Sequence, residues 1–223
     1  MAALYIGNYF YHTAGGLRLK MLCSCLFFLQ GLMNFAFLAR TEKRLSSAPL
    51  LMTLGLFASM AGDYLLNQDF LIGACTFALG HVFYFVSYCL HTPLRKTDLL
   101  PALLLFAGGG SFLVFSPLLS FGDESMRRIC LGYALIISLM AGKTLGNLWK
   151  KRSCLQWLQA FGSLLFFLSD FMLVLNWFTP LGKWTGTLCM AAYYPAQSLL
   201  ALSIFFMTAN KEEISHARDH RAF

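Results

Sequence analysis

Residues 101–115 read PALLLFAGGGSFLVF, a continuous apolar run without a charged side chain. Residues 50–60, LLMTLGLFASM, form a second run of the same kind. A transmembrane β-strand alternates apolar and polar residues with a period of two, and these runs do not alternate. Because the bilayer core offers the backbone no hydrogen-bond partner, only helices and closed barrels span it. The runs therefore predict transmembrane helices.

The whole chain has the composition of a membrane protein. Its 223 residues are 58% hydrophobic and 12% charged, and the mean hydropathy is +0.63. A soluble domain of this length could not cover so much apolar surface. We expect one all-α transmembrane domain over residues 1–209 and a polar tail over residues 210–223. Since a crossing takes about 20 residues, we expect spans near residues 19–39, 47–66, 70–90, 98–119, 126–148, 154–178 and 183–208.

The net charge of +7 reflects membrane topology rather than nucleic-acid binding, because the basic residues lie between the apolar runs. Alternate loops carry 11 Lys and Arg residues on one side and 5 on the other, which predicts a cytoplasmic C-terminus. The N-terminus lies outside with seven spans, and inside if the first sixteen residues form an eighth. A compact chain of this kind is typical of a bacterial inner membrane, and the endoplasmic reticulum is the alternative. No signal indicates an oligomeric state.

Two carboxylates lie inside apolar runs. Asp63 occurs in ASMAGDYLLNQ (58–68) and Asp170 in FFLSDFMLVLNWF (166–178). An ionised, unpaired carboxylate costs several kcal/mol in such surroundings, so intramembrane acids are candidates for function. The two aspartates are 107 residues apart, each near the end of an outward span that precedes a short loop. This spacing suggests two three-helix repeats around a connector helix, the fourth span.

Further polar residues are predicted at similar depth on other spans. His81 and Tyr84 follow one helical stripe, and Ser59 and Asn67 share a face with Asp63. The remaining candidates that line a site are Tyr133, Tyr193, Tyr194 and Gln197. A lone histidine in a bundle is more often a hydrogen-bonded core residue than a metal ligand, so we expect no metal and no cofactor. GKTLG (142–146) is a G-x-x-x-G helix-packing motif.

Five blocks in order resemble the YhhN-like membrane proteins, the lysoplasmalogenase family. They are LFASMAGDYLL (56–66), FALGHVFYFVSY (77–88), YALIISLMA (133–141), GSLLFFLSDFMLVLNWF (162–178) and YYPAQSLL (193–200). The family commonly carries an early Lys-Pro pair, where this chain has Lys20 followed by Met21. The resemblance implies up to eight spans, a site that includes Lys20, and a lysophospholipid substrate among membrane lipids. The implied reaction hydrolyses the vinyl ether bond of lysoplasmalogens to a fatty aldehyde and a glycerophospho-alcohol.

The chemistry of a vinyl ether suits a pair of carboxyl groups. Its hydrolysis begins with protonation of the β-carbon, and water then adds to the oxocarbenium ion. An acid and a base could divide these steps between two aspartates, as the carboxyl pair of a glycosidase does. Asp170 has the more apolar neighbours, Phe167 and Phe171, which favours it as the acid and Asp63 as the base. The alternatives are a proton-coupled transporter that uses the same carboxylates and a non-catalytic lipid-binding protein.

Overall fold

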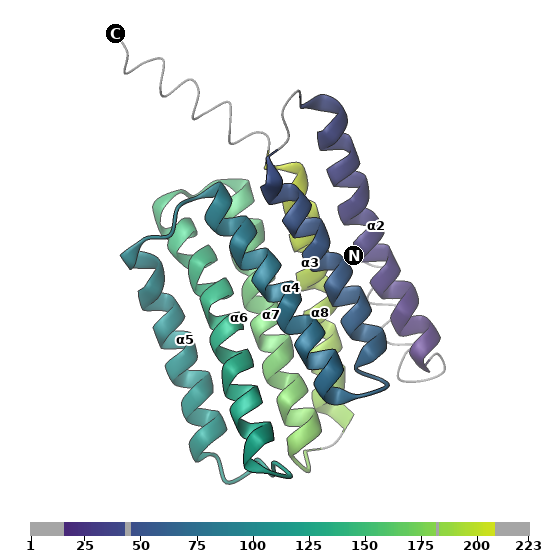
Figure 1. The fold of residues 1–223 in the computed structure, drawn as a ribbon, viewed down its shortest axis with the longest axis vertical. Coiled ribbons are helices and arrows are strands. Elements are labelled where there is room, and N and C mark those ends of the chain that lie inside the picture. The colour runs from purple at the N-terminus through teal and green to yellow at the C-terminus, as the bar shows by residue number, and fades with distance from the viewer. Residues whose placement is uncertain (1–15, 43–45, 182, 208–223) are drawn as a thin grey trace.

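The computed structural model, described over residues 16–42, 46–181 and 183–207, is all-helical in those ranges (Figure 1). All seven of the described helices are long and apolar enough to cross a membrane, which makes this a multi-pass membrane protein. They are α2 (Gly16–Thr41), α3 (Ser47–Leu65), α4 (Phe70–His91), α5 (Lys96–Phe115), α6 (Glu124–Lys150), α7 (Cys154–Phe178) and α8 (Lys183–Phe205). The first fifteen residues, where an eighth span was considered, and the polar tail lie outside the described residues.

The helix boundaries follow local signals in the sequence. Asp69 caps α4 by accepting a hydrogen bond from the Ile72 amide (2.9 Å), and Asp123 caps α6 through the Met126 amide (2.7 Å). The span predicted to run to residue 119 ends instead at Phe115. The cause is Pro117, because a residue that precedes proline avoids the helical region, and Ser116 is extended at φ −72° and ψ 122°.

Six of the helices form a closed ring. The packing order is α2, α3, α4, α6, α7 and α8, and α8 packs back against α2. If α2–α3–α4 and α6–α7–α8 change places in order, each contact between neighbouring helices of the ring falls on another such contact. This equivalence agrees with the two predicted halves. The connector α5 lies outside the ring against α6, at the opposite edge of the bundle from α2 (Figure 1).

The G-x-x-x-G motif brings α5 and α6 together, as predicted. An ideal Cβ on Gly142 would lie 2.4 Å from the Cβ of Ala102, and one on Gly146 would meet Asp98. This close approach lets Lys143 reach across to α5. Its Nζ atom lies 2.8 Å from Asp98 Oδ2, and both side chains are buried. A buried ion pair therefore anchors the helix that lies outside the ring.

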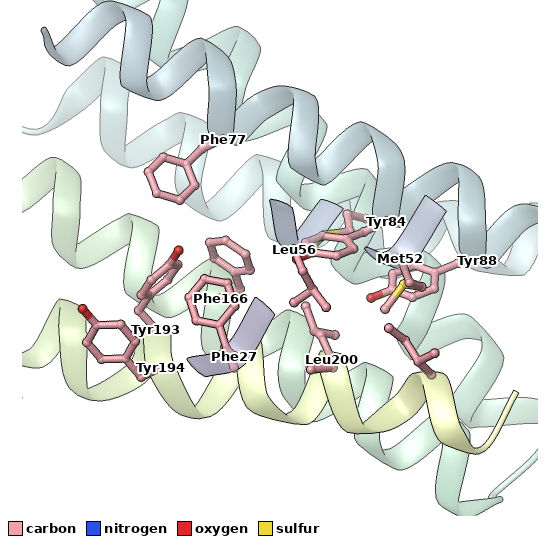
Figure 2. Packing of buried hydrophobic residues seen from close by; sticks show 14 of the residues in the cluster. Phe27, Met52, Leu56, Phe77, Tyr84, Tyr88, Phe166, Tyr193, Tyr194 and Leu200 are labelled. Atoms are coloured by element: carbon pink, nitrogen blue, oxygen red, sulfur yellow. The ribbon is translucent and has the colours of Figure 1, made fainter. Parts of the chain in front are cut away.

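The remaining packing is that of a protein in lipid. Tyr84, Met52 and Tyr88 fill one region of the core, and Phe77, Phe166 and Tyr193 fill another (Figure 2). All four tryptophans lie within four residues of a helix end and are exposed, as expected of side chains at the two membrane interfaces. They are Trp149, Trp157, Trp177 and Trp184.

The helices alternate in direction, so the loops at 66–69 and 116–123 and the stretch after Phe178 lie at one end of the bundle (Figure 1). The backbone amide of Ser120 donates to the carbonyl of Phe178 (2.8 Å), which ties two of these connections together. We call this end of the bundle the site end.

Candidate active site

Asp170 of α7 is held by two side chains from two other helices. The Tyr133 hydroxyl, on α6, donates to Asp170 Oδ2 (2.6 Å), and His81 Nε2, on α4, lies 3.0 Å from the same oxygen. His81 Nε2 also lies 2.8 Å from the Tyr133 hydroxyl, so the three groups form a closed triangle. Asp170 Oδ1 accepts no hydrogen bond from the described residues. The described protein groups therefore hold Asp170 by one oxygen only.

The tautomer of His81 follows from its surroundings. Nδ1 is buried and has no hydrogen-bond partner among the described residues. A buried N–H without an acceptor is costly, whereas Nε2 has two oxygens within reach. We therefore place the ring proton on Nε2, so that His81 donates toward Asp170 and Tyr133.

Asp63 of α3 has a different environment, because it is paired with a cation. Lys20 Nζ, on α2, lies 3.4 Å from Asp63 Oδ1, and both side chains are almost fully buried. Oδ2 accepts hydrogen bonds from Ser24 (2.6 Å) and Tyr193 (2.8 Å). Both carboxylate oxygens of Asp63 are thus engaged by side chains of α2 and α8.

The two networks have equivalent positions in the two halves of the ring. Each aspartate lies on the middle helix of its half and binds the first helix of the same half. Each also binds the last helix of the other half: Tyr193 of α8 contacts Asp63, and His81 of α4 contacts Asp170. The first-helix partners are Lys20 and Ser24 in one network and Tyr133 in the other. The partners differ in chemistry, so the halves are equivalent in position only.

Aromatic rings connect the two networks. The ring centroid of Phe166 lies 4.5 Å from that of His81 and 5.3 Å from that of Tyr193. Phe77 packs edge-on against both Phe166 and Tyr193 (Figure 2). No described residue donates a hydrogen bond to both carboxylates. The aspartates thus belong to separate polar networks, and a single cavity shared by both stays a prediction.

Two hollows lie beside Asp170, and each is lined by both Asp170 and Tyr133. The α5 hollow is formed by Gly109 and Leu113 of α5, Cys130 and Tyr133 of α6, and Phe167 and Asp170 of α7. The α4 hollow lies between α4, α6 and α7 and includes Phe70, Ala74 and Phe77. They leave about 40 Å³ and about 30 Å³ for the centre of a water molecule, where about 10–15 Å³ is enough for one water.

The other predicted site residues contact neither carboxylate in the described structure. Tyr84 donates to Gln197 Oε1 (2.9 Å) and lies 3.4 Å from the Ser59 hydroxyl, and all three side chains are buried. Tyr194 is buried and donates to the Lys20 carbonyl (3.4 Å). Asn67 is exposed at the end of α3 and donates to the backbone oxygen of Asp63 rather than to its carboxylate.

Two residues of the site escaped the sequence reading. Ser24 was not proposed, although it lies one helical turn after Lys20 and is fully buried. Cys130 lines both hollows and was not proposed either. In each case the residue lies one turn from a predicted site residue on the same helical face, Lys20 for Ser24 and Tyr133 for Cys130. Within the described ranges, no group of three or more His, Cys, Asp or Glu residues could hold a metal ion.

The comparison with known proteins identifies the family of this chain. The profile of the YhhN family matches residues 19–204, which include every residue of both networks. The chain belongs to the YhhN family. Human lysoplasmalogenase TMEM86A is 29% identical over 171 residues, which cover 74% of this chain and 68% of that protein. Mouse lysoplasmalogenase TMEM86B is 31% identical over 150 residues, which cover 66% of this chain and 60% of that protein. No solved structure shows a significant match to this YhhN-family chain.

Proposed function

We propose that this protein is a membrane-embedded hydrolase that cleaves the vinyl ether bond of lysoplasmalogens by aspartate acid–base catalysis. The names of the human and mouse relatives support the reaction class. The observation that carries the proposal is Asp170, whose Oδ2 is held by His81 and Tyr133 while the residue borders two hollows. Such a carboxyl group is positioned for proton transfer to a lipid that lies in one of them.

Asp170 acts first as the acid. Among the described residues no lysine or arginine pairs with it, and its partners are His81 and Tyr133. In this scheme the acid carries its proton on Oδ1, and Oδ2 is the carbonyl oxygen that accepts the two hydrogen bonds. Oδ1–H transfers this proton to the β-carbon of the vinyl ether. The electron pair of the double bond forms the new C–H bond, and the ether oxygen shares the resulting positive charge.

The same carboxyl group can complete the cycle. After proton transfer, His81 and Tyr133 stabilise the Asp170 carboxylate through two hydrogen bonds. Water adds to the oxocarbenium carbon, and the proton that this water loses returns to Asp170. The hemiacetal then collapses to a fatty aldehyde and a glycerophospho-alcohol. One water is consumed, and Asp170 ends in its starting state.

Asp63 is the second carboxylate of the proposal. As a base it would act from the ionised state, with Lys20 as its counter-ion. Its oxygens are occupied by Lys20, Ser24 and Tyr193, so it could accept a proton from water only if one of these contacts opened. Asp63 therefore serves as base only after such an opening.

We also propose that the site end of the bundle faces away from the cytoplasm. The loops at the opposite end and the tail carry 11 of the Lys and Arg residues, against 5 near the site end. Such an excess marks the cytoplasmic side of a membrane protein. The substrate would then reach the site from the non-cytoplasmic leaflet.

The direct test mixes the purified full chain with a lysoplasmalogen and measures released aldehyde. A lysophospholipid with a saturated alkyl ether serves as the matched substrate, because it has no double bond to protonate. We expect aldehyde from the vinyl ether alone, and none from the Asp170→Asn protein. Absence of aldehyde from the folded wild-type chain in lipid would contradict the proposal.

A further inference from the structure

The α5 hollow has a direction relative to Asp170. Leu113 and Cys130 line it toward the site end, and Gly109, Ile137 and Phe167 line it toward the membrane interior. From Cys130 to Ile137 is seven residues along α6, or about 10 Å at 1.5 Å per residue. Asp170 and Tyr133 also line it and supply the polar groups that hydrogen-bond to each other. The hollow is therefore a small apolar pocket with a hydrogen-bonded carboxyl group in its wall.

Gly109 makes room in this hollow on the α5 side. It belongs to a run of three glycines, Gly108 to Gly110, which is unfavourable for helix stability. An ideal Cβ on Gly109 would lie 3.6 Å from the ring of Phe167, so any longer side chain would project against α7. A Cβ on Gly108 would meet nothing within 4 Å. Of these two neighbouring glycines, only Gly109 borders the hollow.

The hollow lies at the edge of the bundle rather than at its centre. Among the described helices α5 lies outside the ring, and its Phe112 contacts Phe171 of α7 with ring centroids 5.0 Å apart. Both rings are only partly buried. This aromatic pair therefore lies where α5 and α7 meet, beside the hollow.

We propose that the α5 hollow binds the first carbons of the substrate's hydrocarbon chain, next to the vinyl ether, and that the lysophospholipid enters from the lipid between α5 and α7. The inference rests on the proposed function, and it assigns Gly109 as the residue that makes room for this part of the chain. The apolar lining matches a hydrocarbon chain.

The charge on α6 sets the direction of the bound lipid. Arg127 lies one turn before Cys130 on the same face of α6, at the site end, where it pairs with Glu124 (2.6 Å). It places a cation on the side where a lipid phosphate lies when the chain points into the membrane. The vinyl ether, which joins headgroup and chain, then comes to lie at the level of Asp170 and Tyr133.

The test uses a probe that this chemistry cannot cleave. The probe is a lysophosphocholine with a saturated 1-O-alkyl chain that carries a diazirine within the first few carbons after the ether oxygen, mixed with the full chain in lipid nanodiscs. After irradiation, mass spectrometry identifies the labelled residues. We expect label on Gly109, Ile137 or Phe167, and suppression by excess unlabelled alkyl lysophospholipid. Gly109→Leu should lower this competable label roughly tenfold or more, as pockets discriminate groups of this size, and Gly108→Leu should not.

A second variant guards against misfolding. Ala134→Leu fills the same hollow from α6, and the thermal midpoint of each variant shows whether it folds. Competable label that appears only outside the hollow, or that is unchanged in a folded filling variant, overturns the proposal. Label in the hollow without aldehyde release would leave the chain site standing and refute the hydrolase. Aldehyde release without label in the hollow would support the hydrolase and refute the chain site.

Discussion

His81 and Asp170 belong to opposite halves of the ring, and His81 Nε2 lies 3.0 Å from Asp170 Oδ2. The equivalent contact in the other direction joins Tyr193 to Asp63 at 2.8 Å. Each half therefore provides a partner for the carboxyl group of the other half. Because both bonds cross the seam between the halves, neither carboxyl site can form within one half alone. The predictions below test what each partner does.

Asp170→Asn should reduce aldehyde release by about 10²–10⁴-fold, the usual contribution of a general acid. The amide keeps the shape of the side chain and cannot supply the carboxylic proton. Asp98→Asn is the matched control, because Asp98 is also a buried carboxylate. It lies on α5, outside the ring, and pairs with Lys143 rather than with a residue of either network. This control substitution should lower the thermal midpoint and leave turnover per folded molecule unchanged. A folded Asp170→Asn protein with near wild-type turnover would contradict the assignment.

Tyr133→Phe should slow the reaction by about tenfold, because it removes one of two hydrogen bonds to Oδ2, a loss of about 1–1.5 kcal/mol. The loss should fall on kcat rather than KM, since the bond stabilises the carboxylate formed during proton transfer. Tyr88→Phe is the control, because the Tyr88 hydroxyl contacts Ser163 (3.3 Å) and no carboxylate. Equal effects of the two substitutions on kcat would show that Tyr133 acts only in packing.

Prolonged chelation should leave the activity intact. His81, the histidine nearest to the carboxyl groups, uses Nε2 to contact Asp170 and Tyr133. A catalytic zinc site needs about three protein ligands, and no such group occurs among the described residues. The measurement compares aldehyde release before and after dialysis against a chelator. Loss of activity that added zinc restores would overturn this expectation.

The sequence predicted the spans well, because each apolar run is long and lies between charged or turn residues. It also predicted the depth of His81, Tyr133 and Tyr193, since depth follows from position along a helix. It did not predict that Asp63 and Asp170 have separate partners. Which helix faces which depends on packing over the whole ring, and helices of similar hydrophobicity carry no signal that selects a neighbour. The proline at position 117 could have predicted that α5 ends before Ser116, but the predicted span ran past it.

The Lys20–Asp63 pair allows the role of the second carboxylate to be separated from its effect on stability. Asp63→Asn leaves the buried Lys20 ammonium without its counter-charge, which typically costs about 3–5 kcal/mol. Lys20→Met leaves the carboxylate unpaired and should cost a similar amount. The double variant buries neither charge, so it should be more stable than either single variant, as measured by the midpoint of thermal unfolding.

The activity of this double variant decides the role of Asp63. If Asp63 is the base, the double variant should regain stability and still release aldehyde at least about 10²-fold more slowly than the wild type. The triple variant that adds Asp170→Asn should then be little worse than Asp170→Asn alone, because paired acid–base groups act as a unit. Recovery of turnover together with stability would instead mean that Asp63 and Lys20 only hold α2 against α3. Asp170 would then carry both proton transfers, with His81 and Tyr133 as its partners.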